Sequence, residues 1–219
     1  VDRVVNSLFK DFPNADRDAH TRVVAMRHGP ATPSQPMRIV FSSGPAILIR
    51  LAGEPTYEDV ADTELQQLRN TDALIVRDGS GIHYLSIGGR WLEAPDLNGT
   101  WSLAGAVPEG ADLARQAYIA RHRDPYATVQ PHGPAPMVYV AVGPAELVIT
   151  DGEPAYDGVT GTSLMRMRNA HAAASEEPTD HQHYVHVPAG WFRWWTTNGP
   201  WQAITPSELP ADLARITAQ

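Results

Sequence analysis

The sequence predicts a mainly β protein, a β-rich α+β fold. In it, two tandem copies of a small barrel- or sandwich-like unit of short antiparallel strands are each closed by a C-terminal helix. One observation is an internal repeat, because the Ala-Asp-Leu-Ala-Arg run of 111–115 returns at 211–215. Another is the content of 19 Pro and 17 Gly, which indicates many turns and short elements. Further residues that return 100 positions later include Pro36, Met37, Trp91, Asn98, Gly99 and Trp101.

The repeat divides the chain into four segments. Residues 1–35 are expected to form an N-terminal helix and linker, and residues 36–120 the first β repeat. Residues 121–135 contain three prolines and are expected to be a second linker. Residues 136–219 then form the second β repeat.

Within the first repeat, short β-rich runs are separated by turn residues. The clearest hairpin joins 82–87 to 90–94 through Gly88 and Gly89, because a type I′ turn needs positive φ at both central residues. A helix is expected over 108–120. The other expected strands span 38–41, 46–52, 57–60, 65–69 and 73–77.

The second repeat predicts the same order of elements. A Gly-Glu-Pro turn at 152–154 matches the one at 53–55, and a helix is expected near 207–217. The expected strands span 138–142, 145–150, 164–168, 184–187 and 191–195.

Composition excludes several classes of function. The formal net charge of −8 argues against a nucleic-acid partner, because phosphate binding relies on clustered Lys and Arg. No apolar run approaches the roughly 20 residues that span a bilayer, so no transmembrane segment is expected. The absence of Cys excludes thiol nucleophiles and thiolate metal sites. No Ser-His-Asp set, phosphate-binding glycine loop or suitably spaced carboxylate pair is found, so neither a catalytic residue nor a cofactor is expected.

Three segments of the second repeat carry a resemblance to a known family. They are Pro-Ala-Glu-Leu-Val-Ile-Thr-Asp-Gly-Glu-Pro at 144–154, Asn-Gly-Pro-Trp at 198–201 and Leu-Pro-Ala-Asp-Leu at 209–213. These segments resemble the repeats of a bacterial tandem-repeat family often labelled "carbohydrate-binding family V/XII", and the likeness extends over 36–115 and 136–217. The resemblance implies a β-rich, exported bacterial protein that is periplasmic or extracellular.

Aromatic residues are densest in the second repeat. Flat aromatic faces are platforms on which sugar rings stack. Trp194 and Trp195 have no counterparts in the first repeat, so they are the first candidates for ligand contact, followed by Phe192 and Tyr184. The tryptophans that both repeats share, which we expect in the core, are Trp91, Trp101, Trp191 and Trp201.

Histidines suggest a metal-site hypothesis. His181 and His183 form an H-x-H pair, and on a regular strand both imidazoles would lie on one face within reach of one Zn²⁺. His186 would point the opposite way, and no third ligand is obvious. The corresponding residues of the first repeat are Gly81 and His83, so the pair is not shared. Surface or hydrogen-bonded histidines, without a metal, are the favoured interpretation.

A second chemical hypothesis concerns Arg27-His28-Gly29. This tripeptide follows an apolar run and mimics the signature of histidine phosphatases, in which the His accepts the phosphoryl group. Such an enzyme also needs a second His, an acid and an α/β sheet. The β-rich remainder of the chain favours a coincidental match.

The sequence as a whole favours a non-catalytic binding or assembly module of an exported bacterial protein, contacting a polysaccharide or a protein partner. One alternative is a structural subunit of a surface assembly, with self-association of the chain. Another is a hydrolase, either a phosphatase that uses His28 or a metal-dependent enzyme that uses His181 and His183. The residues alone leave these alternatives open.

Overall fold

The computed structural model describes residues 37–122, 126, 135–195 and 201–217. Within these ranges the chain forms two compact units, and it passes from one to the other at Gly44-Pro45 and at Ala145-Glu146. Residues 45–145 form the insert unit. Residues 37–44 together with 146–217 form the host unit. The boundaries between the two units therefore lie outside the 121–135 segment, at which the sequence repeat divides the chain.

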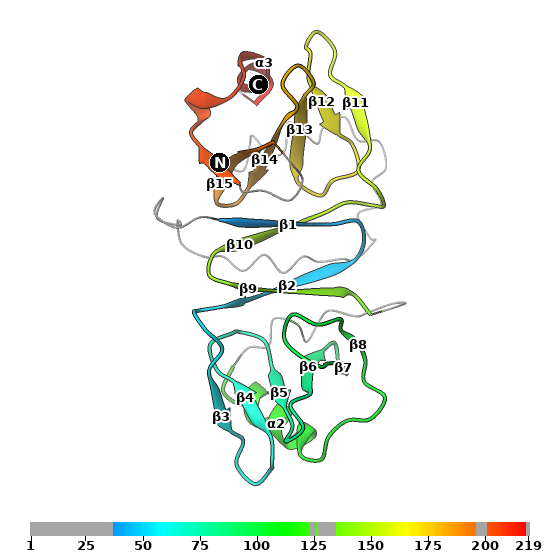
Figure 1. Ribbon diagram of the computed structural model, residues 1–219, viewed down its shortest axis with the longest axis vertical. Helices are drawn as coiled ribbons and strands as arrows, with labels where there is room; N and C mark the ends of the chain where they lie inside the picture. The colour runs from blue at the N-terminus through cyan, green and yellow to red at the C-terminus, as the bar shows by residue number, and fades with distance from the viewer. Residues whose placement is uncertain (1–36, 123–125, 127–134, 196–200, 218–219) are drawn as a thin grey trace. The chain divides into compact units, whose positions relative to one another are not determined.

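The insert unit is built on six antiparallel strands that follow one another in chain order, each paired with the next (Figure 1). Helix α2, Ala111–Ile119, comes after the last strand. The strands are β3 (Tyr57–Asp59), β4 (Gln66–Leu68), β5 (Ile75–Arg77), β6 (His83–Ile87), β7 (Arg90–Ala94) and β8 (Ser102–Leu103).

The expected Gly-Gly hairpin is confirmed. Strands β6 and β7 pair in antiparallel fashion, with Ile87 opposite Arg90. Gly88 and Gly89, between them, have φ values of 53° and 77°. Both angles are positive, as a type I′ turn requires of its two central residues.

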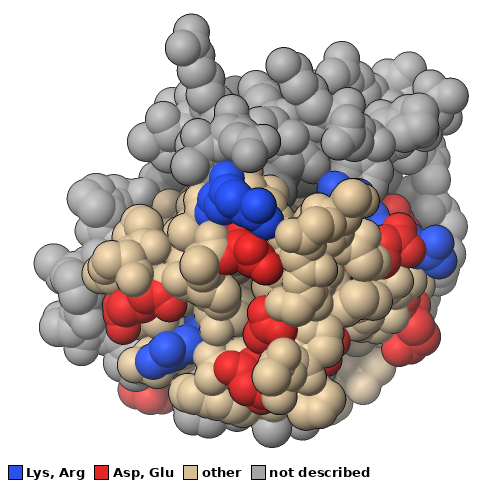
Figure 2. Space-filling view, turned by 90° about the horizontal axis from the view of Figure 1, so that it is seen from above, with Lys and Arg blue, Asp and Glu red and all other residues tan. Residues whose placement is uncertain are grey.

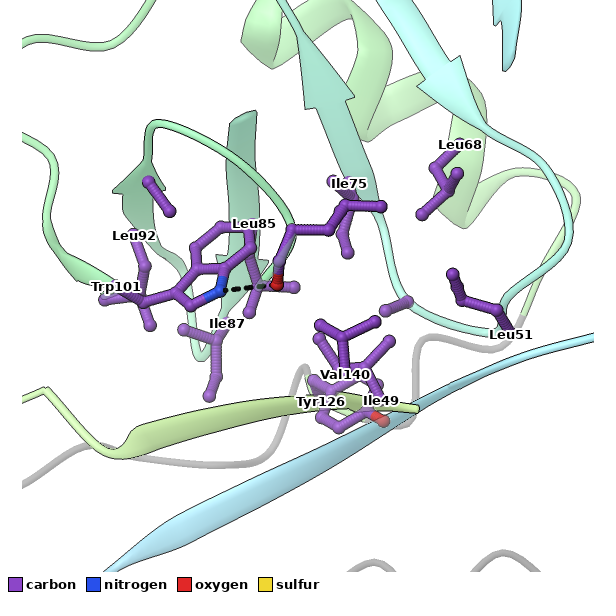
Figure 3. Packing of buried hydrophobic residues seen from close by; sticks show 13 residues of the cluster. Ile49, Leu51, Leu68, Ile75, Leu85, Ile87, Leu92, Trp101, Tyr126 and Val140 are labelled. Atoms are coloured by element: carbon purple, nitrogen blue, oxygen red, sulfur yellow. Dashed lines mark hydrogen bonds between the residues drawn. The ribbon is translucent and has the colours of Figure 1, made fainter. Parts of the chain in front are cut away.

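Both faces of the insert sheet are covered by apolar residues. Successive strand residues point to opposite faces, so Trp91 and Leu92 belong to different buried clusters. The cluster of Trp91 includes Ala114 and Tyr118 of helix α2. In the other cluster, Trp101 Nε1 donates a hydrogen bond to the Leu97 carbonyl at 3.4 Å (Figure 3). Figure 3 labels Ile49, Leu51, Leu68, Ile75, Leu85, Ile87, Leu92, Trp101, Tyr126 and Val140 of this cluster.

The host unit contains a second sheet of six antiparallel strands in chain order. One of its buried clusters contains Trp194 and Trp201, and the other contains Leu213 of the C-terminal helix. The strands are β11 (Tyr156–Gly158), β12 (Met165–Met167), β13 (Ala173–Glu177), β14 (Gln182–Val187), β15 (Gly190–Trp194) and β16 (Gln202–Ile204). The helical segments that follow are η1 (Pro206–Glu208) and α3 (Ala211–Thr217).

The prediction of a mainly β protein is confirmed, but its barrel alternative is wrong. In the described part of the chain, the first and last strands of each six-stranded sheet have one neighbour each, so neither sheet closes on itself. Each sheet has a buried apolar cluster on both of its faces. An open sheet packed on both sides buries these residues, whereas a closed barrel would turn one face outward. In the same described ranges, no helix combines the length and the hydrophobicity that crossing a bilayer requires.

Four further strands pair across long stretches of sequence. Strand β2, Ala46–Leu51, runs parallel to β9, Met137–Val142, with Ala46 opposite Met137. Strand β1, Arg38–Ser42, pairs with β10, Ala145–Ile149. Strands β1 and β2, which follow one another in the chain, therefore pair with strands far along the sequence rather than with each other. Strands β2 and β9 belong to the insert unit, whereas β1 belongs to the host unit.

Candidate functional site

The aromatic residues of β15 divide between the two faces of the host sheet. Phe192 and Trp194 point into the cluster that also holds Trp201. Trp191 is partly buried against the other cluster, on the side of helix α3. Arg193 lies on the same face as Trp191, because alternate strand residues share a face.

Trp194 is not a surface residue. Only 1% of it is exposed, and its ring centroid lies 3.7 Å from that of Trp201 and 4.8 Å from the stacked ring of His183. Phe41 of β1 packs on it at 5.5 Å. The prediction that Trp194 offers its ring to a ligand is therefore wrong, because strand β1 covers this face of the sheet.

The secondary candidates Phe192 and Tyr184 are also core residues, each with 4% of its surface exposed. Phe192 belongs to the cluster of Trp194, and Tyr184 to the cluster beneath α3. The Tyr184 hydroxyl donates to Gln182 Oε1 at 2.9 Å, and burial raises the pKa of this phenol. Neither ring is available as a binding platform.

Of the four aromatic candidates, Trp195 remains on the surface. It follows β15 directly and is 53% exposed. The guanidinium of Arg193 lies 5.6 Å from the centroid of its ring, within the range of a cation–π contact. Arg193 Nε and Nη2 both donate to Gln202 Oε1, at 3.1 and 3.0 Å. An exposed indole thus stands beside two planar polar side chains that hold each other in place.

A carboxylate completes this surface. Glu208 Oε2 accepts hydrogen bonds from the Thr205 backbone N–H at 2.8 Å and from the Thr205 hydroxyl at 2.9 Å. These two bonds lower the pKa of Glu208, and the positive charge of Arg193 lowers it further. We call Trp195, Arg193, Gln202 and Glu208 the Trp195 surface. At neutral pH it carries the positive charge of Arg193 beside the Trp195 ring, and the negative charge of Glu208, which senses that of Arg193.

The H-x-H hypothesis fails on geometry. His181 precedes β14 in a left-handed conformation with φ of 54°, so it does not lie on the regular strand that the hypothesis required. Its exposed side chain lies 3.4 Å from Glu176, while His183 is stacked on Trp194. No group of three or more His, Asp or Glu side chains suited to a metal occurs in the part of the chain that the structure describes. His28 lies outside the described residues.

The structure reveals a polar row in the insert unit that sequence reasoning missed. Asp59, Gln66, Arg77 and His83 are cross-strand neighbours on β3, β4, β5 and β6. Arg77 Nε and Nη2 donate to Gln66 Oε1 at 2.9 and 2.7 Å, and Gln66 Nε2 donates to Asp59 Oδ1 at 2.9 Å. Tyr57 hydrogen-bonds His83 Nε2 at 2.8 Å, and the Arg77 guanidinium lies 3.7 Å above the Tyr57 ring.

The matching row of the host unit is less polar. It runs through Gly158, Met165, Glu176, His183 and Trp194 on β11 to β15. A histidine on the fourth strand is common to both rows. Because side chains in such a row meet only in the correct register, each row favours one alignment of its strands. The recurrence of this histidine is the one signal in the sequence that points to the rows.

We expect acidification to destabilise the protein through three histidines that are buried or partly buried. Burial lowers the pKa of His83, His183 and His186. The unfolded chain, with histidine pKa values of about 6.5, therefore binds protons before the folded one. Stability is complete above that pH and is lost as the pH falls below it toward the folded-state values. Urea unfolding at pH 7.5, 6.5 and 5.5 should show falling midpoints, with a shallower fall in His186→Gln. Equal midpoints at all three values would contradict this assignment.

Figure 2 shows acidic and basic side chains scattered over the described part of this face, where Lys and Arg do not gather into one basic region. Comparison with known protein families, curated proteins and solved structures finds no match to this chain. The Trp195 surface and the two cross-strand rows are therefore interpreted from their chemistry alone.

Proposed function

We propose that this chain is a non-catalytic binding module that contacts a polysaccharide through the Trp195 surface, outside the cytoplasm. The observation that carries the proposal is the exposure of Trp195 beside Arg193 and Gln202. When an apolar face covers an indole that is half exposed to water, the free energy falls, which favours binding. The axial C–H face of a sugar ring supplies such a cover, while its hydroxyls need polar partners.

The polar residues of the Trp195 surface suit these hydroxyls. A guanidinium carries only donors, whereas a carboxylate carries only acceptors. Arg193 and Glu208 thus complement the mixed donor and acceptor character of sugar hydroxyls. Arg193 stands opposite Gln202 on paired strands, and both side chains are tied by two hydrogen bonds. This preorganisation lowers the entropy cost of binding.

We further propose that the chain is an internal duplication, with each copy ending in a helix. Two six-stranded sheets in the same sequential order support this proposal, as does the histidine shared by the two rows. In the first copy, Glu93, Pro95 and Ser102 occupy the places of Arg193, Trp195 and Gln202. Only the second copy would then bind a glycan, while the first has a scaffolding role.

The test is titration with a panel of soluble polysaccharides, followed by tryptophan fluorescence and calorimetry. We expect at least one glycan to bind the natural chain. Trp195→Ala should weaken that binding about fivefold or more, since an aromatic contact contributes about 1 kcal/mol. Trp195→Phe should retain most of the affinity.

Leu113→Ala is the matched control, because Leu113 is 43% exposed but lies on α2 of the insert unit. Circular dichroism of each variant verifies folding. A panel without any binder, or equal affinities for the natural chain and Trp195→Ala, would refute the glycan proposal. Capture of a purified protein partner that depends on Trp195 would instead support a protein ligand and also refute it.

A further inference from the structure

Two pairs of consecutive strands, β1–β2 and β9–β10, are joined by short links but do not pair with each other as hairpins do. Strands β1 and β2 are linked only by residues 43–45, and β9 and β10 only by Gly143 and Pro144. Links this short normally join two strands that pair with each other. In the sheets that the structure describes, β1 instead pairs with β10, and β2 with β9. Strand β1 therefore leaves its neighbour in the chain and completes a unit whose other described strands begin far along the sequence.

Strand β1 fills a defined place in the host unit. Ile39 is 6% exposed within the Trp194 cluster, and Phe41 is stacked on Trp201 with ring centroids 5.4 Å apart. The Thr150 backbone N–H donates to the Ser42 carbonyl at 2.8 Å, across 108 positions of sequence. A host unit without β1 would expose Trp194 and Trp201 to water.

We infer that β1 is exchanged between two copies of this chain, each copy completing the host unit of the other. Every contact of β1 described above is the same whichever copy supplies the strand. Only the link at 43–45 changes its course. Such a dimer is closed and symmetric, because each chain donates and receives the same segment.

Concentration decides between the closed monomer and the exchanged dimer. Within one chain the short link gives β1 a local concentration on the order of 1 mM. The monomer is therefore favoured when the protein folds at about 1 μM, and exchange becomes competitive when it folds at about 1 mM. Once formed, the dimer should persist on dilution, since separation requires β1 to leave a buried position.

A cysteine pair across the β1–β10 contact tests this inference in the full chain. The natural sequence has no Cys, so Ser42→Cys with Thr150→Cys introduces the only thiols. The variant is refolded under oxidising conditions at about 1 μM and at about 1 mM, the range that brackets the local concentration, and is then run on a non-reducing denaturing gel. We expect monomers from the dilute sample and disulfide-linked dimers from the concentrated one.

The control places cysteines at Glu58 and Gln67, which are opposite each other on β3 and β4 of the insert unit. This pair should close within one chain at both concentrations. Light scattering of the natural chain, refolded in the same way, gives a second measurement that needs no substitution, and a dimer that survives dilution is expected. Only monomers in both measurements, or covalent dimers from the control pair as well, would overturn the inference.

Discussion

Replacing Trp194 by alanine should lower the free energy of unfolding by about 3–5 kcal/mol, the usual cost of truncating a large buried aromatic residue. Trp194 is 1% exposed and touches Phe41, His183 and Trp201. Its loss would leave a cavity that Phe41, His183 and Trp201 cannot refill without moving the backbone. A cost of this size is a large fraction of the stability of a small protein.

The adjacent residue is the control. Trp195→Ala removes the same side chain one position later, where 53% of it is in water, and should change stability by about 0.5 kcal/mol or less. Urea unfolding followed by circular dichroism gives both values under one set of conditions. Equal costs for the two substitutions would contradict the opposite burial of these neighbours. The pair also separates stability from ligand binding, because the proposed binding surface includes Trp195 but not Trp194.

Sequence reasoning succeeded where the signal is local or is repeated. The core was expected to hold the recurring tryptophans Trp91, Trp101, Trp191 and Trp201; three of them are buried, whereas Trp191 is only partly buried. The Gly88-Gly89 turn was predictable because its residues alone determine the backbone geometry. The conformation of the turn depends only on its own residues. The tryptophans could be recognised because the same residue stands at the same place in both halves of the sequence.

Prediction failed where the cause lies far away in the chain. Alternation along β15 separates Trp194 from Trp195, but it does not tell which face is covered. The cover is Ile39 and Phe41 of β1, and the pairing of β1 with β10 rather than β2 has no signature in either segment. The polar row through Arg77 was missed for a related reason, since its members meet only when four strands are in register.

Gly110→Ala should be the second costly substitution, lowering the free energy of unfolding by about 2–5 kcal/mol. Gly110 caps the N-terminus of α2 with φ of 86°, a conformation that costs an L-residue about 1–2 kcal/mol. A Cβ atom there would also lie 2.5 Å from Cγ2 and 2.8 Å from Cβ of Thr63. Overpacking of this kind adds about 1–3 kcal/mol. Thermal or urea unfolding measures the sum.

Two further variants separate the backbone and steric parts of this cost. Gly53 has φ of 97° but no atom within 4 Å of an added Cβ, so Gly53→Ala reports the backbone part alone. Thr63→Ser removes Cγ2 but keeps the hydroxyl that bonds the Val60 carbonyl and the Leu65 N–H. In the double variant with Gly110→Ala it should recover part of the loss, giving a favourable coupling in the mutant cycle. Equal costs at Gly53 and Gly110, together with no coupling to Thr63, would mean that α2 does not approach Thr63 as closely as the structure shows.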